Sequence, residues 1–166
     1  MIVQAHGIRL DVPDGWEARI YRRPHGDPTL HTANFTLPVD DGDFGAGAVL
    51  SMPPGGEFLC LTEYRPGDGL VPGRGLFAAG PLPLPLRSSH FRPRVLHVAR
   101  SGSFGLQHFF TTAGRPFCLY AVIRPPRTGA RASGDGTSLG LNRVLSTVSI
   151  AGARGGAPAG RAAVRP

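Results

Sequence analysis

Alternating apolar and polar positions organise the beginning of the chain. Residues 8–12 and 16–21 each alternate the two kinds of side chain, and Pro13-Asp14-Gly15 lies between them. A period of two is typical of a half-buried strand, and Pro-Asp-Gly is typical of a tight turn. The pattern therefore predicts a β-hairpin or tight strand pair over residues 8–21.

Further strands are expected where apolar runs lie between breaks rich in Pro and Gly. The runs are residues 30–37, 57–64, 94–100, 104–112 and 116–123. Residues 44–52 are ambiguous, because Gly and Ala recur there at alternate positions. The segment 65–89 predicts a long irregular connection, and its alternate prolines at 81–86 favour an extended edge or polyproline stretch.

A helical pattern appears only near the end of the sequence. Within residues 137–148, Leu141, Val144, Leu145 and Val148 have the spacing of one helix face. A mobile basic loop is expected before it, at 124–136, and a disordered tail after it, at 151–166. Together the elements predict a single α+β domain over residues 1–150. Its antiparallel sheet has about seven strands, with a C-terminal helix packed on one face.

Charge is distributed unevenly along the 166 residues. All 18 basic residues are Arg, which together with abundant Gly, Ala and Pro is typical of a high-GC genome. Residues 1–86 hold six Arg and ten acidic residues (−4), whereas 87–166 hold twelve Arg and one acidic residue (+11). This asymmetry permits binding to an acidic partner. The candidate contacts are Arg92, Arg94, Arg100 and Arg115, near the ends of the predicted second-half strands. Alternatively, they pair with first-half acids such as Asp11, Glu17 and Glu63.

The two cysteines point to a reducing compartment. Cys60 and Cys118 each lie in an apolar run, and no CxxC is present. Buried, inert thiols are the expectation for both, since nothing in the local sequence marks a reactive site. The N-terminus lacks the pattern of a signal peptide, and no apolar run is long enough to cross a membrane. A cytoplasmic location without a membrane span follows as a prediction.

Candidate chemistry is sparse. The six histidines form no HxH, HxxH or HExxH motif, so no metal site is assigned. His97 and His108 lie on successive predicted strands and could be cross-strand neighbours. The acidic run 40–43 lacks downstream calcium ligands and predicts a solvated turn. With no complete catalytic motif, no catalytic residue and no cofactor site are assigned, and the chain is predicted not to be an enzyme.

Two stretches resemble a known family. Residues 8–16, IRLDVPDGW, resemble the opening of the PsbP-like family, where a strand runs into Pro-x-Gly-Trp and a second strand. Strand 117–123, followed by a loop and NRVLSTV at 142–148, is similar to that family's final strand and helix. The whole chain also resembles small proteins of high-GC actinobacteria. The resemblance implies an α/β/α sandwich used as a non-catalytic accessory or binding module, and it assigns no site residues.

Three functions stay open on the sequence. The first is a non-enzymatic accessory or protein-interaction module, whose partner is unknown and could be acidic. The second is a small hydrolase or ligand-binding domain that uses His97 and His108. The third is Arg-mediated binding to an anionic partner such as nucleic acid. Nucleic acid is disfavoured, because the second-half aromatic residues fit a core better than an exposed stacking surface.

Overall fold

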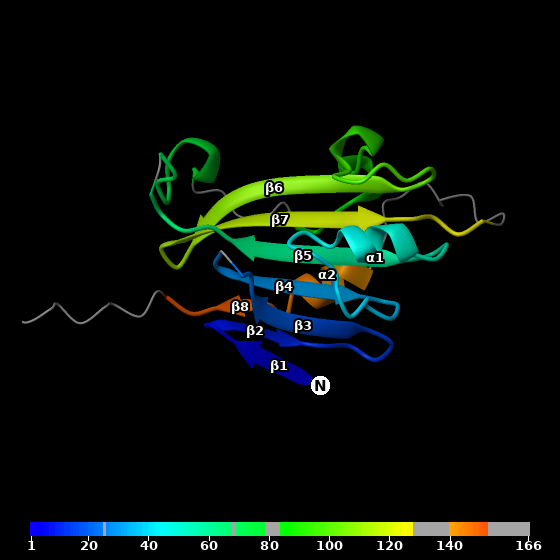
Figure 1. Ribbon diagram of the computed structural model, residues 1–166, viewed down its shortest axis with the longest axis horizontal. Coiled ribbons are helices and arrows are strands. Elements are labelled where there is room, and N and C mark those ends of the chain that lie inside the picture. The colour runs from blue at the N-terminus through cyan, green and yellow to red at the C-terminus, as the bar shows by residue number, and fades with distance from the viewer. Residues whose placement is uncertain (25, 68, 79–83, 128–139, 153–166) are drawn as a thin grey trace, which may run out of the picture.

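Two antiparallel sheets and a few short helices make up the computed structural model, which describes residues 1–24, 26–67, 69–78, 84–127 and 140–152 (Figure 1). The larger sheet has the order β3-β4-β5-β7-β6, and the smaller one has the order β1-β2-β8. The strands are β1 (Ile2–Ala5), β2 (Ile8–Asp11), β3 (Glu17–Arg22), β4 (Pro28–Ala33), β5 (Glu57–Glu63), β6 (Phe104–Thr112), β7 (Arg115–Ile123) and β8 (Ser149–Ile150). The helices are α1 (Ala46–Ser51) and α2 (Gly140–Leu145), with 3-10 turns η1 (Gly75–Phe77), η2 (Ser88–His90) and η3 (Pro93–Val95). The α+β class is confirmed, but one seven-stranded sheet is wrong.

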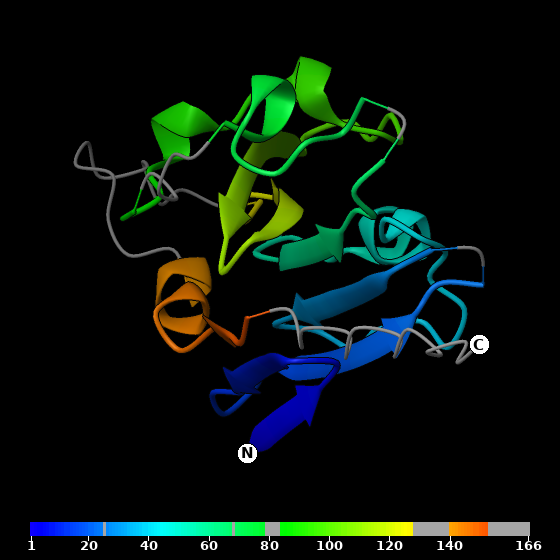
Figure 2. The same cartoon turned by 90° about the vertical axis from the view of Figure 1, so that its left-hand side faces the viewer.

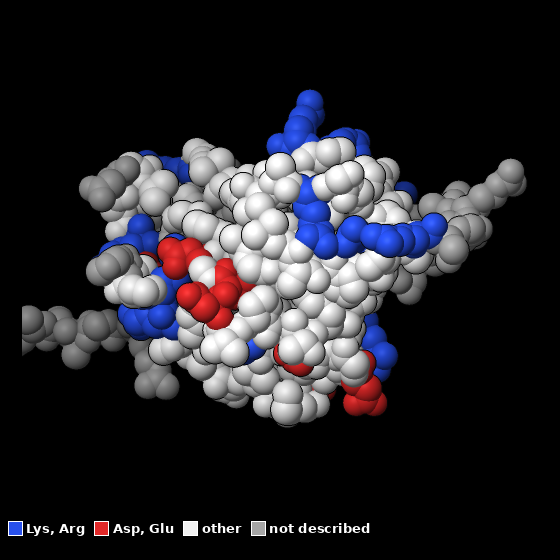
Figure 3. Space-filling view, turned by 45° about the vertical axis from the view of Figure 1, so that its right-hand side comes forward, with Lys and Arg blue, Asp and Glu red and all other residues white. Residues whose placement is uncertain are grey.

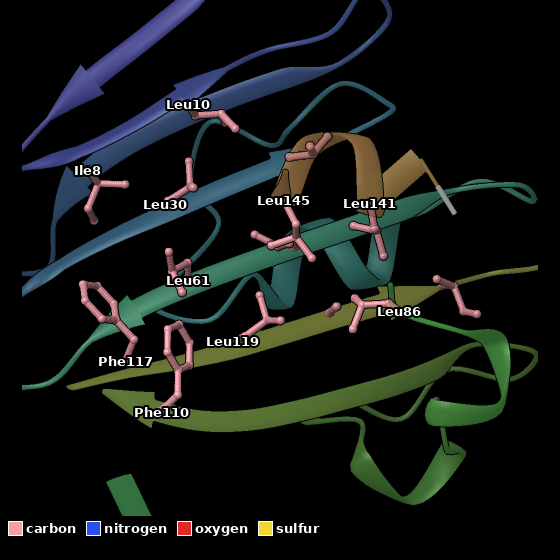
Figure 4. Packing of buried hydrophobic residues seen from close by; sticks show 14 of the residues in the cluster. Ile8, Leu10, Leu30, Leu61, Leu86, Phe110, Phe117, Leu119, Leu141 and Leu145 are labelled. Carbon is pink, nitrogen blue, oxygen red and sulfur yellow. The ribbon is translucent and has the colours of Figure 1, made fainter. Parts of the chain in front are cut away.

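One face of the larger sheet carries the main core, and we call it the α2 face. Helix α2 and strand β2 pack against it, and their side chains meet those of the sheet (Figure 4). The fully buried members include Ile8, Leu10, Leu30, Leu59, Leu61, Phe117, Leu119, Leu141 and Val144. The apolar spacing that predicted a C-terminal helix is therefore confirmed at Gly140–Leu145, where it covers the sheet. Residues 128–139, which include the start of the predicted helix, lie outside the described residues.

The opposite face, which we call the α1 face, holds a second core. Helix α1 lies on the other side of the larger sheet from α2 (Figure 2). Its Ala48 and Val49 pack with Phe58, Tyr120 and Val122 of the sheet. This core is smaller than the first, and polar side chains take its place toward one end of β4 and β5.

The predicted hairpin over residues 8–21 is wrong, because its two strands belong to different sheets. β2 pairs with β1 and β8, whereas β3 pairs with β4. The Pro13–Gly15 turn is present, since the amide of Trp16 donates to the carbonyl of Pro13 at 3.1 Å. The hairpin forms instead at His6-Gly7, where both φ angles are positive (51° and 75°). Two such residues make the turn that best matches strand twist, so Ile2–Ala5 becomes the partner of β2.

The structure confirms some of the other predicted segments and corrects others. Strands 104–112 and 116–123 are confirmed as the hairpin β6–β7, and 57–64 as β5. The strand predicted at 94–100 is wrong, since this stretch is a 3-10 turn at Pro93–Val95 followed by a loop. The ambiguous segment 44–52 contains helix α1. Residues 79–83 and 153–166, with half of the predicted polyproline stretch at 81–86 and most of the predicted tail, lie outside the described residues.

Candidate ligand pocket and buried polar cluster

Buried polar side chains gather on the α1 face of strands β4 and β5. The register places His31 opposite Cys60 and Thr29 opposite Thr62, so four side chains of one face become neighbours. All four are at most 1% exposed. Polar groups survive such burial only when they bond one another, and the two threonine hydroxyls lie 3.0 Å apart. The Cys60 Sγ lies 3.0 Å from the Thr62 hydroxyl and 3.4 Å from that of Thr29.

A buried ion pair completes this cluster. The His31 Nδ1 lies 2.7 Å from the Asp41 Oδ2, and the two side chains are 1% and 4% exposed. The other Asp41 oxygen accepts a hydrogen bond of 2.6 Å from the Ala48 amide in helix α1. Asp41 therefore does not belong to a solvated turn, as the sequence predicted for residues 40–43, but closes over the sheet.

The ion pair changes the protonation of the imidazole. Burial by itself lowers the pKa of His31, but the Asp41 carboxylate and the Cys60 thiol outweigh it and raise that pKa from 6.5 to about 9. At neutral pH the ring is therefore an imidazolium that faces a carboxylate. Both ring nitrogens are engaged, since Nε2 also lies 3.4 Å from the carbonyl oxygen of Asp43.

Two side chains of β3 hold the loop 37–43 above the cluster. The Arg19 guanidinium donates to the carbonyls of Pro38 at 2.5 Å and Leu37 at 2.6 Å. The Tyr21 hydroxyl donates to the Gly42 carbonyl at 2.6 Å and lies 3.3 Å from the His31 Nε2. Burial and the nearby Cys60 and Asp41 raise the pKa of Tyr21, so its hydroxyl keeps its proton. The loop is thus fixed by charge and hydrogen bonds rather than by apolar packing.

Between this loop and β3 lies a hollow of about 700 Å³. That volume is within the range of small-molecule sites. Its lining joins apolar side chains to three cationic groups and three carboxylates: Ile20, Leu37, Val39, Arg19, Arg22, His31, Asp40, Asp41 and Asp43. The lining is close to neutral overall but strongly dipolar. Such a surface suits a ligand that carries both signs of charge.

The structure separates the four arginines predicted to bind a partner. Arg92 and Arg94 are exposed on either side of Pro93 in η3. Arg100 reaches the end of helix α1, where it donates to the carbonyls of Leu50 and, at 2.9 Å, Met52. The backbone of Arg92 pairs with Gly105 near the start of β6, whereas Arg115 pairs with Thr112 at its end. On the face drawn in Figure 3, arginines and acidic side chains are both present, so charge is mixed there.

The Arg115 side chain is buried and forms hydrogen bonds within the fold. Its side chain is 7% exposed, and it forms two hydrogen bonds with the Glu63 carboxylate, at 2.8 and 2.6 Å. It also donates to the carbonyls of His6 at 2.9 Å and Ala151 at 3.0 Å, which border the smaller sheet. This arginine thus joins the two sheets and pairs with a first-half acid, the alternative that the sequence left open.

The two histidines of the hydrolase alternative lie on opposite faces of the larger sheet. His108 stacks on Phe110 in the core of the α2 face. The His97 ring contacts Tyr120, at 4.4 Å between centroids, and Tyr120 belongs to the core of the α1 face. His97 lies in a loop rather than on a strand, so the predicted cross-strand neighbourhood is wrong.

Comparison with known proteins adds no relative: no family model, no curated protein and no solved structure matches this chain. Across the described residues, no cluster of three or more His, Cys, Asp or Glu side chains could hold a metal ion. The described helices are also too short or too polar to cross a membrane.

The sequence analysis missed His31, Asp41 and Cys60 as a group. They come from β4, from a loop and from β5, and only strand register brings them together. A buried-strand histidine, nine residues before the acidic run that begins at Asp40, was the one available signal.

Proposed function

We propose that this chain is a non-enzymatic binding module whose recognition site is the hollow between β3 and the loop 37–43. The observation that carries the proposal is the His31–Asp41 ion pair, which lines a hollow of about 700 Å³. Charged groups lining a pocket and kept out of water supply orientation and specificity, while apolar walls supply contact area. An accessory or binding role also agrees with what the PsbP-like resemblance implies.

The ligand class follows from the lining. Asp40 and Asp43 are exposed around the hollow, Arg19 of β3 lies on the same face as His31, and Leu37 and Val39 offer apolar contacts. We therefore propose a small zwitterionic ligand, such as an amino acid or the end of a short peptide. Its ammonium group would face the aspartates, and its carboxylate would face Arg19.

Protonation of His31 supports binding rather than catalysis. A general base must be free of its proton at the working pH. The pKa of His31, raised to about 9 by Asp41 and Cys60 against the effect of burial, keeps the proton on the ring at pH 7. The imidazolium instead holds Asp41, and with it the loop, in place. Both cysteines are free, which favours work in a reducing cytoplasm.

The test is a titration of isotope-labelled protein with free amino acids and dipeptides, followed by amide chemical shifts in NMR. We expect shifts confined to β3, β4 and the loop 37–43 with at least one ligand of the panel. Tyr21→Phe should weaken that binding, because its hydroxyl positions Gly42. Tyr64→Phe is the matched control, since Tyr64 lies outside the hollow, against Phe77 and Phe109. Absence of shifts across the whole panel, or shifts centred elsewhere, would contradict the proposal.

A second candidate rests on Arg92 and Arg94. Both side chains are exposed, and neither forms an ion pair with any described residue. Two unpaired guanidiniums beside one 3-10 turn suit an acidic protein partner. Nucleic acid fits less well, because Phe109 packs against Phe77 and Tyr64 instead of offering a free stacking face.

A further inference from the structure

We propose that Cys60 is a peroxide-reactive thiol, with His31 as its proton donor and Asp41 as the group that orients the imidazole. Cys60 and His31 are directly paired across β5 and β4. The Cys60 Sγ and the His31 Nε2 approach the same carbonyl oxygen, that of Asp43, at 3.9 and 3.4 Å. On its other side the imidazole meets Asp41 at 2.7 Å. A thiol, an imidazole and a carboxylate in this order form an activated nucleophile.

Polar groups surround the Cys60 sulfur, whose thiol donates to the Asp43 carbonyl at 3.9 Å. The imidazolium supplies a positive charge beside the sulfur, and the hydroxyls of Thr62 and Thr29, at 3.0 and 3.4 Å, can donate hydrogen bonds to it. The sequence predicted inert thiols because no basic residue stands near Cys60 along the chain. The basic neighbour of Cys60 is His31, which lies on the adjacent strand β4.

The reaction balances with hydrogen peroxide as the oxidant. The thiolate sulfur attacks one peroxide oxygen, so an S–O bond forms while the O–O bond breaks. The leaving hydroxide takes the proton of the His31 imidazolium and departs as water. Sulfur is oxidised by two electrons to a sulfenic acid, peroxide is reduced, and the neutral imidazole regains a proton from solvent.

Burial selects which oxidant can react. Cys60 is 0% exposed, whereas its neighbours His31, Asp41 and Asp43 line the hollow. Hydrogen peroxide is close to water in size and polarity, so it can pass where larger electrophiles cannot. The titratable and charged groups near the pair are Tyr21 and Arg19 of β3, Asp41 and Asp43 of the loop, and Tyr120 and Cys118 of β7.

Cys118 is a matched control within the same molecule. It lies on the same face of the same sheet and is 2% exposed. No imidazolium raises its reactivity, and burial raises the pKa of its thiol to about 12. The two thiols therefore differ in their neighbours rather than in their access to solvent.

The experiment exposes the folded full chain to hydrogen peroxide and follows oxygen addition at each cysteine by peptide mass spectrometry. At pH 7 we expect Cys60 to oxidise about tenfold faster than Cys118, because the His31 imidazolium beside Cys60 can protonate the leaving hydroxide.

Variants separate the chemistry from the packing. His31→Gln should slow Cys60 to the rate of Cys118, while His90→Gln, the same substitution on η2 and away from the cluster, should leave it unchanged. Equal rates at the two cysteines, or no oxidation of folded Cys60, would each overturn the inference. If His31→Gln does not fold, the comparison of the Cys60 and Cys118 oxidation rates in the wild-type protein still tests the inference. Hydrogen peroxide is the only probe in this experiment. If no amino acid or dipeptide binds in the NMR titration, the oxidation result is therefore unaffected.

Discussion

Within the part of the chain that the structure describes, each face of the larger sheet holds one largely buried ion pair, and the two pairs differ in kind. On the α2 face, Arg115 and Glu63 form two hydrogen bonds beside the main core. On the α1 face, His31 and Asp41 form one, at the bottom of a loop-covered hollow. Arginine stays charged at every pH that a folded protein meets, whereas histidine titrates near neutrality.

The difference teaches which pair holds the fold together and which pair serves the site. Arg115 also donates to the carbonyls of His6, Gly7 and Ala151, so a permanent charge links the two sheets. The His31 cluster instead holds the loop 37–43, through Asp41 and Tyr21, and the helix α1 that follows it, through the Ala48 amide. A titratable pair under a loop can change with conditions without disturbing the main core.

The largest effect is expected from Arg115→Met. This change leaves the Glu63 carboxylate buried without its partner, and removing one partner of a buried pair costs about 3–5 kcal/mol. Urea unfolding should show this loss at pH 6.5 and at pH 9 alike. The control is Arg143→Met, an exposed arginine of helix α2. A loss below about 1 kcal/mol, as is usual for a surface pair, would contradict the role of Arg115 as a link between the sheets.

The second effect is a pH dependence that belongs to the α1 face alone. The Asp41 carboxylate and the Cys60 thiol, against burial, raise the pKa of His31 from 6.5 to about 9. The folded state therefore holds the proton more tightly than the unfolded chain. This stabilisation is fully present below pH 6.5 and is lost as pH rises through 9. At 1.36 kcal/mol per pKa unit, about 3 kcal/mol should disappear across this window.

Unfolding free energies measured at intervals from pH 6 to 10 check this prediction. His31→Gln should abolish most of the slope, and His90→Gln should keep it, because His90 lies on η2, away from the cluster. A wild-type stability that is flat from pH 6.5 to 9, or that increases, would show that the pair is not an imidazolium–carboxylate pair.

A smaller effect is expected from Tyr21→Phe. The variant loses the 2.6 Å hydrogen bond to the Gly42 carbonyl, and one such bond contributes about 1 kcal/mol. Hydrogen exchange of the loop 37–43 should accelerate while that of β7 stays unchanged. Acceleration in both places would mean that the loop and the core open together, which would remove the contrast between the two faces.

The fold was predictable where local pattern decides it. β6 and β7 are long apolar runs that turn at Ala113-Gly114, where both φ angles are positive (52° and 73°), so their hairpin followed from sequence. Strand pairing at the N-terminus could not be predicted in this way. The alternation of apolar and polar residues indicates which side chains are buried, but it does not indicate which strand is the partner. The partner of β2 proved to be Ile2–Ala5.

The site depended on contacts between distant residues. His31, Asp41 and Cys60 are unremarkable in their own segments, and each acquires its chemistry from the other two. Counting charges along the chain gave a wrong expectation for the same reason, because it ignores which residues become neighbours in the fold. The counts placed Arg115 among exposed arginines, although the Glu63 that neutralises it lies 52 residues earlier.

The smallest effect on stability is expected from reversing the two exposed arginines of η3. Arg92→Glu with Arg94→Glu should change the unfolding free energy by about 0.5 kcal/mol or less, because surface substitutions outside packed networks have little effect. Among the described residues, the Arg92 guanidinium donates hydrogen bonds to the nearby carbonyls of Ser89 and Phe91, which solvent can replace. If this turn receives an acidic partner, binding to poly-glutamate should nevertheless weaken strongly and lose its salt dependence. Arg74→Glu with Arg143→Glu removes the same charge from two other exposed positions and should leave that binding unchanged. Equal weakening by both variants would mean that net charge, rather than a site at η3, attracts the acidic chain.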